Sequence, residues 1–290
     1  MNEQNHKKKK KKGSPVLTLV FLLAVLVFMF SLWKLTDILS GYHEVEKEYG
    51  EIAQEMEQQT VPVPTLPQPE IQLNESQETA AAAQATLEVI IETEDVSEET
   101  EAPFVLYVPD FAELKRINSD VIGWIQIPGT KINYPIVQGD DNEYYLTHTV
   151  NGEENSGGAI FMDAAIEDRF EDKNAIIYGH NLKSGAMFSR LNRYARKSFW
   201  DANRYIYITT PFGMSTYQVF SAYQTTADAD IYYYGFEEDQ YFQEYLDRIV
   251  SYSIFNAGVS VNKEDTIITL STCANDTTQR FIVHAKKLAE

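Results

Sequence analysis

The chain has 290 residues, of which 44% are hydrophobic and 12% aromatic, enough for one sizeable folded core with accessory segments. Its formal net charge of −19 argues against nucleic acid as a partner, because a phosphate backbone is bound through basic surface. The single cysteine excludes an intrachain disulfide and any zinc site built from several cysteines.

The N-terminal segment has the features of a membrane anchor. Six consecutive lysines occupy positions 7–12, and the 18 residues Val16–Trp33 are apolar except for Thr18 and Ser31. As a helix, such a stretch would span roughly 27 Å, close to the hydrocarbon thickness of a bilayer. We therefore predict a cytoplasmic basic N-terminus over residues 1–15 and a transmembrane signal-anchor helix over residues 16–39, with the rest of the chain outside the cell.

A cleaved signal peptide is the alternative interpretation of this segment. Such a peptide has a shorter apolar region, followed by a cleavage site with small residues. The sequence after Trp33 reads Lys34-Leu-Thr-Asp-Ile-Leu-Ser-Gly and holds no convincing site of this kind. The uncleaved anchor is therefore favoured.

Residues 40–103 have the composition of an acidic, proline-containing tether. Between positions 41 and 103 there are 16 acidic residues and one basic residue, Lys47, and Val61–Pro69 holds four prolines. Tyr42–Gln59 could form a charged helical stalk, but the composition as a whole favours a solvated, disordered linker. Such a linker would lift the folded domain off the membrane.

Residues 104–290 are predicted to form one folded domain that is mainly β. A short helix is expected over Phe111–Ile117, and aromatic and apolar residues at helical spacing predict one long amphipathic helix over Glu237–Phe255, with Tyr241 and Tyr252 included in its core stripe. Many short strands with one late helix favour a closed or nearly closed barrel. The predicted strands are Val121–Pro128, Pro135–Gln138, Ala159–Asp163, Ala175–His180, Arg204–Thr209, Met214–Gln224, Thr266–Thr272 and Arg280–Lys287.

Cys273 follows the predicted strand Thr266–Thr272 and precedes a polar segment. Alternation along this strand places Thr269, Ser271 and Cys273 on its more polar face. A thiol at such a strand end is better placed for reaction than for packing, although a buried structural cysteine is the alternative.

A nucleophilic thiol needs a partner that accepts its proton or stabilises its charge. Of the domain's histidines, His180 ends a buried strand at the entrance to a loop, His148 lies in a predicted helix or turn, and His284 lies within a strand, where histidine is more often structural. Arg280 begins the strand after the Cys273 loop, so a hairpin would return it beside Cys273, where a guanidinium can donate hydrogen bonds to an oxyanion. A solvent-facing arginine at a strand edge is the alternative.

These motifs together resemble the sortases, and within them class B. Thr269-Leu-Ser-Thr-Cys273 is similar to the family's nucleophile strand, Tyr178-Gly-His180 to its histidine motif, and Gln279-Arg-Phe carries the matching arginine. The resemblance covers about residues 104–290. Three further segments look like class B: Ile117–Trp124, Ile132–Pro135 and Tyr144–Leu146.

The resemblance implies an eight-stranded β-barrel with an N-terminal helix and a long helix before the seventh strand. It also implies a cysteine transpeptidase that cleaves a C-terminal sorting signal after Thr. Cys273 would form the thioester, His180 would transfer protons, and Arg280 would stabilise the oxyanion or hold the substrate. Ser271 and Tyr178 would line the substrate groove. No metal or other cofactor is expected, and Asp140, Asp141 and Glu143 are predicted to form a solvated loop.

The implied partners are secreted proteins with a C-terminal sorting signal and an acceptor amine on a peptidoglycan cross-bridge. The expected location is the bacterial cell membrane, with a single pass and an extracellular catalytic domain. A pilin-polymerising enzyme with a lysine acceptor, a plain hydrolase and an inactive membrane-tethered binding module remain alternatives. Ala274 departs from relatives that often carry a polar or acidic residue after the nucleophile, so no substrate contact is carried over to this position.

Overall fold

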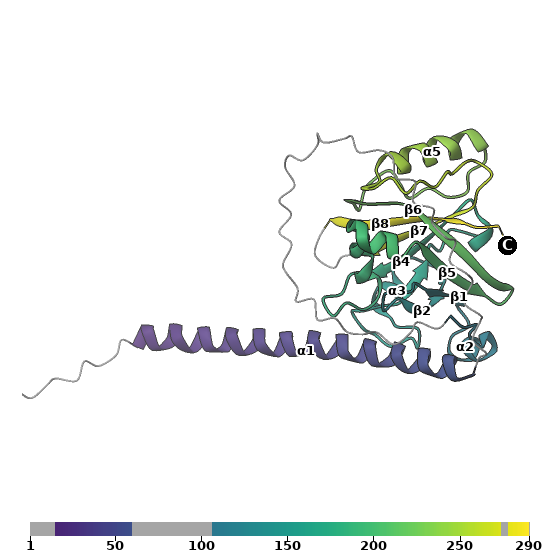
Figure 1. Ribbon diagram of the computed structural model, residues 1–290. Coiled ribbons are helices and arrows are strands. Elements are labelled where there is room, and N and C mark those ends of the chain that lie inside the picture. The colour runs from purple at the N-terminus through teal and green to yellow at the C-terminus, as the bar shows by residue number, and fades with distance from the viewer. Residues whose placement is uncertain (1–14, 60–105, 274–277, 290) are drawn as a thin grey trace, which may run out of the picture.

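The structure, a computed structural model, describes residues 15–59, 106–273 and 278–289 (Figure 1). Within these residues the strands are β1 (Val121–Gln126), β2 (Asn133–Val137), β3 (Ile160–Met162), β4 (Asn174–His180), β5 (Tyr205–Thr210), β6 (Gly213–Thr226), β7 (Ile267–Cys273) and β8 (Gln279–Lys287). The helices are α1 (Pro15–Gln59), α2 (Phe111–Ile117), α3 (Tyr144–Thr147), α4 (Lys197–Ala202) and α5 (Asp239–Ser251), with 3₁₀ helices η1 (Arg169–Glu171) and η2 (Phe188–Ala195).

The strands close into a barrel in the order β1-β2-β3-β4-β7-β8-β6-β5, and pairing of β1 with β5 completes the ring. Two pairs, β2 with β3 and β4 with β7, are parallel, and the others are antiparallel. Apolar side chains from many strands, among them Ile125, Ile176, Leu270 and Val283, are fully buried in one core. The predicted eight-stranded barrel, with a helix before its seventh strand, is confirmed.

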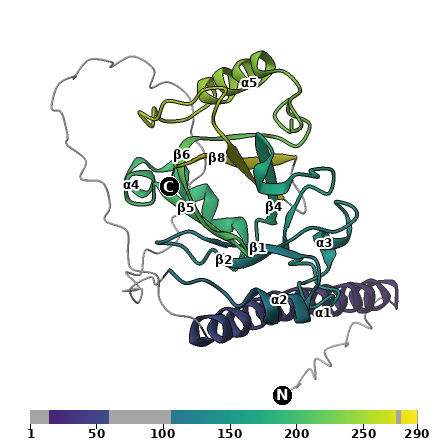
Figure 2. The same ribbon diagram turned by 90° about the vertical axis from the view of Figure 1, so that its right-hand side faces the viewer.

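Helix α5 covers the outer face of β6, β7 and β8, so the barrel lies between α5 on one side and α1 on the other (Figures 1 and 2). Phe242, Leu246 and Ile249 form a second apolar cluster with Ile267 and Ile282. Strand β7 is therefore buried on both faces. The helix is shorter than predicted, and the prediction that Tyr241 and Tyr252 belong to its buried stripe is wrong, because both side chains are exposed.

Helix α1 continues without a break from the apolar N-terminal segment onto the barrel. Residues 40–59, which the sequence analysis assigned to the tether, form its C-terminal part. There Val45, Tyr49, Ile52 and Met56 recur every three or four residues and are buried. Residues 60–103, the rest of the predicted tether, lie outside the described residues.

A buried polar network crosses the interface between the barrel and α5. The Thr269 hydroxyl donates to Asn174 Oδ1 at 2.7 Å, and His284 contacts the Thr269 hydroxyl through Nδ1 and the Tyr223 hydroxyl through Nε2, both at 2.9 Å. A neutral imidazole with its proton on Nδ1 satisfies all of these bonds. Burial lowers the pKa of His284 to about 3, so this ring stays neutral across the physiological range.

This burial predicts a loss of stability in acid. The unfolded His284 takes up a proton below about pH 6.5, whereas the folded protein excludes it down to about pH 3, so falling pH favours the unfolded state across this window. His284 should contribute about 1.4 kcal/mol of lost stability per pH unit there. Denaturant unfolding of the full chain in detergent between pH 7 and pH 4 measures this slope. His284→Gln cannot be protonated and should give a shallower slope; equal slopes would contradict the assignment.

Candidate active site

The ends of β4 and β7 bring His180 and Cys273 together. The two strands pair in parallel over seven residues, from Asn174 opposite Ile267 to His180 opposite Cys273. Beyond the last pair, the Asn181 backbone N–H donates to the Cys273 carbonyl at 2.9 Å. Neighbouring positions in a parallel ladder lie about 4.8 Å apart, so two residues far apart in sequence share one small region.

Backbone packing at Gly179 permits this arrangement. A Cβ atom at this position would lie 2.4 Å from Ile160 Cδ1 and 2.8 Å from the Phe188 ring. Glycine is therefore required between Tyr178 and His180 for the strand to pack against η2 and β3.

The imidazole of His180 is buried and held by the backbone of α3. Its Nε2 lies 2.9 Å from the Leu146 carbonyl oxygen. Because a carbonyl can only accept, Nε2 carries the proton in this contact. The Leu146 carbonyl thus fixes the orientation of the ring at the strand end.

The Cys273 thiol is half-buried, and its charge state follows from this position. Burial raises its pKa to about 11, while the nearby Arg280 guanidinium and a hydrogen bond from the Gly179 backbone act in the opposite direction. The resting thiol is therefore protonated at neutral pH. A base must take its proton when it reacts.

Arg280 lies at the start of β8, the strand that pairs with β7 in the barrel wall. The antiparallel register, with Ser271 opposite Ile282, directs Arg280 back to the level of Cys273. Its guanidinium donates to the Gln279 carbonyl at 3.0 Å and acts electrostatically on Cys273. The structure thus brings Cys273, His180 and Arg280 to one end of the barrel.

Tyr178 and Ser271 are register partners two residues before His180 and Cys273 on the same strands. The Tyr178 hydroxyl donates to Asp163 Oδ2 at 2.9 Å, and burial together with this carboxylate raises the pKa of Tyr178. Ser271 is almost fully buried and shares a 3.1 Å hydrogen bond with the Tyr232 hydroxyl. Both predicted groove residues are next to the site and are engaged in hydrogen bonds.

Tyr232, Asp163 and the Leu146 carbonyl, which also lie at this end of the barrel, were not predicted from the sequence. Tyr232 lies on the connection between β6 and α5, and its ring centroid is 6.1 Å from that of Tyr178. Burial raises the pKa of Tyr232, the Ser271 hydrogen bond and the Arg280 charge lower it, and the Cys273 charge raises it. A run of three tyrosines before a predicted helix was the available signal for Tyr232; a backbone carbonyl leaves no signal in a sequence.

The other two domain histidines lie outside this cluster. His148 follows α3, stacks on the Tyr144 ring at 4.1 Å, and has its Nδ1 2.9 Å from the Tyr144 carbonyl. His284 belongs to the buried network under α5. In the nearby acidic loop, Asp141 accepts hydrogen bonds from the Glu143 and Tyr144 backbone before α3.

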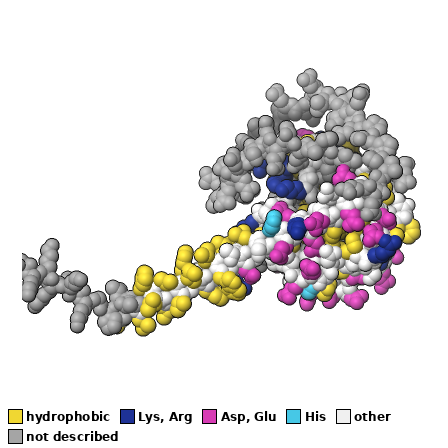
Figure 3. All heavy atoms as spheres, turned by 90° about the horizontal axis from the view of Figure 1, so that it is seen from below, with side chains coloured by type: hydrophobic (Ala, Val, Ile, Leu, Met, Phe, Trp, Pro, Cys, Tyr) yellow, Lys and Arg dark blue, Asp and Glu magenta, His cyan; other side chains and the backbone are white. Residues whose placement is uncertain are grey.

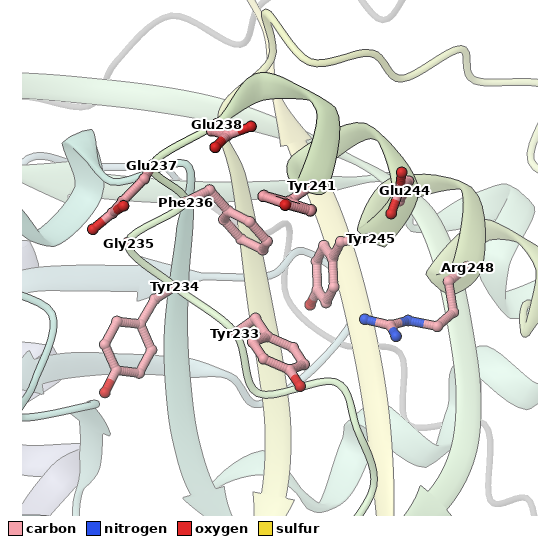
Figure 4. A pocket seen from close by; sticks show the side chains of 10 residues that line it. All are labelled: Tyr233, Tyr234, Gly235, Phe236, Glu237, Glu238, Tyr241, Glu244, Tyr245 and Arg248. Carbon is pink, nitrogen blue, oxygen red and sulfur yellow. The ribbon is translucent and has the colours of Figure 1, made fainter.

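A pocket of about 430 Å³ lies on the connection between β6 and α5 and is lined by residues between Tyr233 and Arg248 (Figure 4). The Arg248 guanidinium lies 5.7 Å from the ring centres of Tyr233 and Tyr245 and forms a 3.0 Å ion pair with Asp230. These contacts hold the β6–α5 connection against α5. They thereby support the segment that carries Tyr232 to the Cys273 end of the barrel.

A closed eight-stranded barrel with a cysteine and a histidine at the ends of paired parallel strands, and an arginine on the next strand, defines a sortase-type cysteine transpeptidase. The model of the family described as "Sortase domain" matches residues 125–288. The chain belongs to the sortase family, in its class B.

Its relatives are sortase B proteins. The chain is 39% identical over 181 residues to sortase B of Staphylococcus aureus, covering 61% of this chain and 74% of that protein. It is 40% identical over 169 residues to sortase B of Listeria monocytogenes, covering 57% and 67%. Among solved structures, the S. aureus sortase B–substrate complex matches with a TM-score of 0.59 and 39% identity, over 61% of this chain and 84% of that one. Sortase B from Bacillus anthracis matches with a TM-score of 0.66 and 29% identity, over 87% and 100%.

The site geometry predicts that Arg280 tunes the Cys273 thiol. Arg280→Ala removes the cation that favours the thiolate, so the Cys273 pKa should rise and alkylation at pH 8 should slow about threefold to tenfold. Because the chain has one cysteine, iodoacetamide labelling followed by mass spectrometry reads this thiol alone. Arg280→Lys retains the charge and should stay near the parent rate. Identical pH profiles for all three proteins would show that Arg280 does not act on the thiol.

Proposed function

We propose that this chain cleaves a C-terminal sorting signal after Thr through a Cys273 thioester and transfers the protein to a cell-wall amine. The pairing of His180 with Cys273 at the ends of β4 and β7 carries this proposal. The family is that of cysteine transpeptidases, and Cys273 is the only cysteine that could serve.

The first half-reaction begins from a protonated thiol, because burial raises the Cys273 pKa. When the substrate carbonyl is in place, the sulfur attacks it and the thiol proton passes to His180. The tetrahedral oxyanion forms near Arg280, whose guanidinium donates hydrogen bonds to it. The C–N bond then breaks, His180 gives a proton to the departing amine, and Cys273 is left as a thioester.

The second half-reaction reverses these roles. An acceptor amine attacks the thioester carbonyl and loses a proton to His180. The C–S bond then breaks as the new amide forms, and the departing Cys273 sulfur takes up the proton from His180. The Leu146 carbonyl supports both steps, since it accepts from Nε2 and stabilises the protonated ring between proton transfers.

Substrate recognition is proposed for Tyr178 and Ser271, with Tyr232 beside them. Tyr178 and Ser271 lie on the β4–β7 pair two residues before His180 and Cys273, and the Tyr232 hydroxyl is hydrogen-bonded to Ser271. Asp163 accepts a hydrogen bond from the Tyr178 hydroxyl, so the Tyr178 oxygen can still act as an acceptor for a peptide N–H.

The partners follow from relatives. The S. aureus protein is described in complex with substrate, and another sortase B structure is described in complex with a triglycine peptide. These complexes support a secreted, sorting-signal-bearing substrate and an amine acceptor of the peptidoglycan cross-bridge type for this chain. No cofactor is required by the proposed steps.

We further propose a single-pass location in the bacterial cell membrane. Among the described residues, α1 is long and apolar enough to span a bilayer, and the lysine run precedes it. By this proposal residues 1–15 are cytoplasmic, residues 16–39 span the membrane, and the catalytic domain of residues 104–290 is extracellular.

The thioester is the sharpest test of the function. Incubation of the full chain in detergent with a library of sorting-signal pentapeptides should produce a covalent adduct on Cys273, detected by mass spectrometry. Addition of an oligoglycine or diamino-acid amine should discharge the adduct as an amide product. Cys273→Ala, which retains the fold but has no sulfur, should give neither species.

The absence of an adduct from a folded protein whose thiol still reacts with iodoacetamide would contradict the transpeptidase proposal. That result would favour the inactive, membrane-tethered binding module. Discharge by water at the same rate with and without amines would instead indicate a hydrolase.

Tyr178 provides a second test, directed at recognition. Tyr178→Phe removes one hydroxyl and should raise KM for the sorting-signal peptide about threefold to tenfold with little change in kcat, because one hydrogen bond contributes about 0.5–1.5 kcal/mol. Asp163→Ala should act in the same direction by releasing the Tyr178 hydroxyl. Tyr207→Phe on β5, three strands from β7 in the barrel, is the matched control. Unchanged KM in the first two variants would remove Tyr178 from the groove.

A further inference from the structure

We propose that α1 docks the barrel directly against the membrane surface, with the Cys273 end of the barrel facing the lipid headgroups. This inference rests on the proposed membrane location. It replaces the picture of a catalytic domain held away from the bilayer by a flexible tether, since the described part of α1 leaves no spacer between the apolar helix and the barrel.

The apolar half of α1 projects free of the barrel (Figure 3). Large hydrophobic side chains are exposed along it from Val16 to Leu39. A helix with apolar side chains on all of its faces fits a lipid environment, because in water these side chains would have no apolar surface to pack against. The occupant of this surface is therefore the bilayer interior.

The docked half begins immediately afterwards. The Asn155 side chain donates to the Gly41 carbonyl at 3.1 Å, two residues, or about 3 Å, beyond Leu39. The Tyr49 hydroxyl donates to the Gly158 carbonyl at 3.1 Å and accepts from the Val150 N–H at 3.0 Å.

Val45 makes a further close contact between α1 and the barrel. A Cβ atom added to Gly157 would lie 2.7 Å from Val45 Cγ2, so the helix and the loop meet at glycine distance. Together with the hydrogen bonds on either side, this contact makes α1 and the 150–158 segment one packed unit.

The barrel end nearest the membrane is the Cys273 end. Asn155 at the membrane-proximal contact donates its N–H to the Thr147 carbonyl, and the preceding residue, Leu146, supplies the carbonyl that holds His180. The apolar segment is therefore connected to the His180 imidazole through a short path. This path runs from Leu39 to Gly41 along α1, through Asn155, and then through α3 to His180.

The arrangement in space agrees with this chain of contacts. In Figure 1 the free part of α1 projects to the left, and β8 runs rightward to the marked C-terminus. Because β7 and β8 are antiparallel, the end of β7 lies at the left end of this pair, on the side of the free helix. A substrate still embedded in the bilayer would thus present its segment just outside the membrane to the reacting groups.

Energy transfer from the barrel to the membrane surface tests the orientation without using activity. In the full chain with Cys273→Ala, a single cysteine is placed at exposed Thr226, the β6 residue that pairs with Gln279, or at fully exposed Phe212, just before the other end of β6. The two positions are separated by roughly 40 Å of strand. Each protein is labelled with a donor dye and reconstituted in phosphatidylcholine vesicles that carry an acceptor on the headgroups.

The expected result is about twofold more transfer from position 226 than from position 212. Insertion of about ten Gly and Ser residues between Leu39 and Ser40 preserves docking but frees the barrel, and should bring the two values together. Equal transfer in the parent chain, or more from position 212, would overturn the orientation.

Flotation of the vesicles separates this inference from the proposed location. A chain that does not float with vesicles overturns both proposals, whereas one that floats and shows equal transfer overturns only the orientation. Thioester formation is measured separately on the parent chain, which retains Cys273, so failure of the proposed function can be told apart from failure of the orientation.

Discussion

The parallel pairing of β4 with β7 is the constraint on which the rest of the site depends. Side chains alternate along a strand, so a slip of one residue would turn His180 away from Cys273 and move Leu270 out of the core. The slip is opposed from both sides, since β7 has apolar contacts with the barrel interior and with α5. The buried bond between Thr269 and Asn174, residues on these two strands, pins the same register with a polar contact that a shifted ladder could not make.

The electrostatics of the site follow from this burial. Desolvation keeps the Cys273 thiol protonated, and the Arg280 charge partly offsets that effect. A protein with one cysteine gains from such a balance, because oxidants attack thiolates far faster than thiols. The reactive form would then be generated only when a bound substrate excludes water and delivers a carbonyl to the sulfur. The Leu146 carbonyl completes the arrangement, since it is an acceptor that gains strength when the imidazole becomes charged.

The strands, and the site residues at their ends, could be predicted from the sequence because both depend on local pattern. Alternation predicted the strands, and a polar residue after an apolar run located His180 and Cys273. Strand order could not be predicted in this way, because β4 and β7 are separated by two other strands and α5. Nor could contacts such as that of Tyr178 with Asp163, which depend on how β3 and β4 pair. Tyr241 and Tyr252 show the limit of periodicity, since helical spacing selects a face but not how far the neighbouring strands extend beneath it.

Residues 40–59 show how composition can conceal a packing surface. Glutamates dominate this segment, yet Val45, Tyr49, Ile52 and Met56 form a stripe that needs only one face of the helix. The acidic residues then occupy the solvated faces, and net charge says nothing about docking. Because the 144–158 segment contacts α1 on one side and His180 on the other, the helix and the imidazole share a structural element. A helix that undocked from the barrel would remove support from Leu146, so the docking of α1 and the orientation of the His180 ring depend on the same contacts.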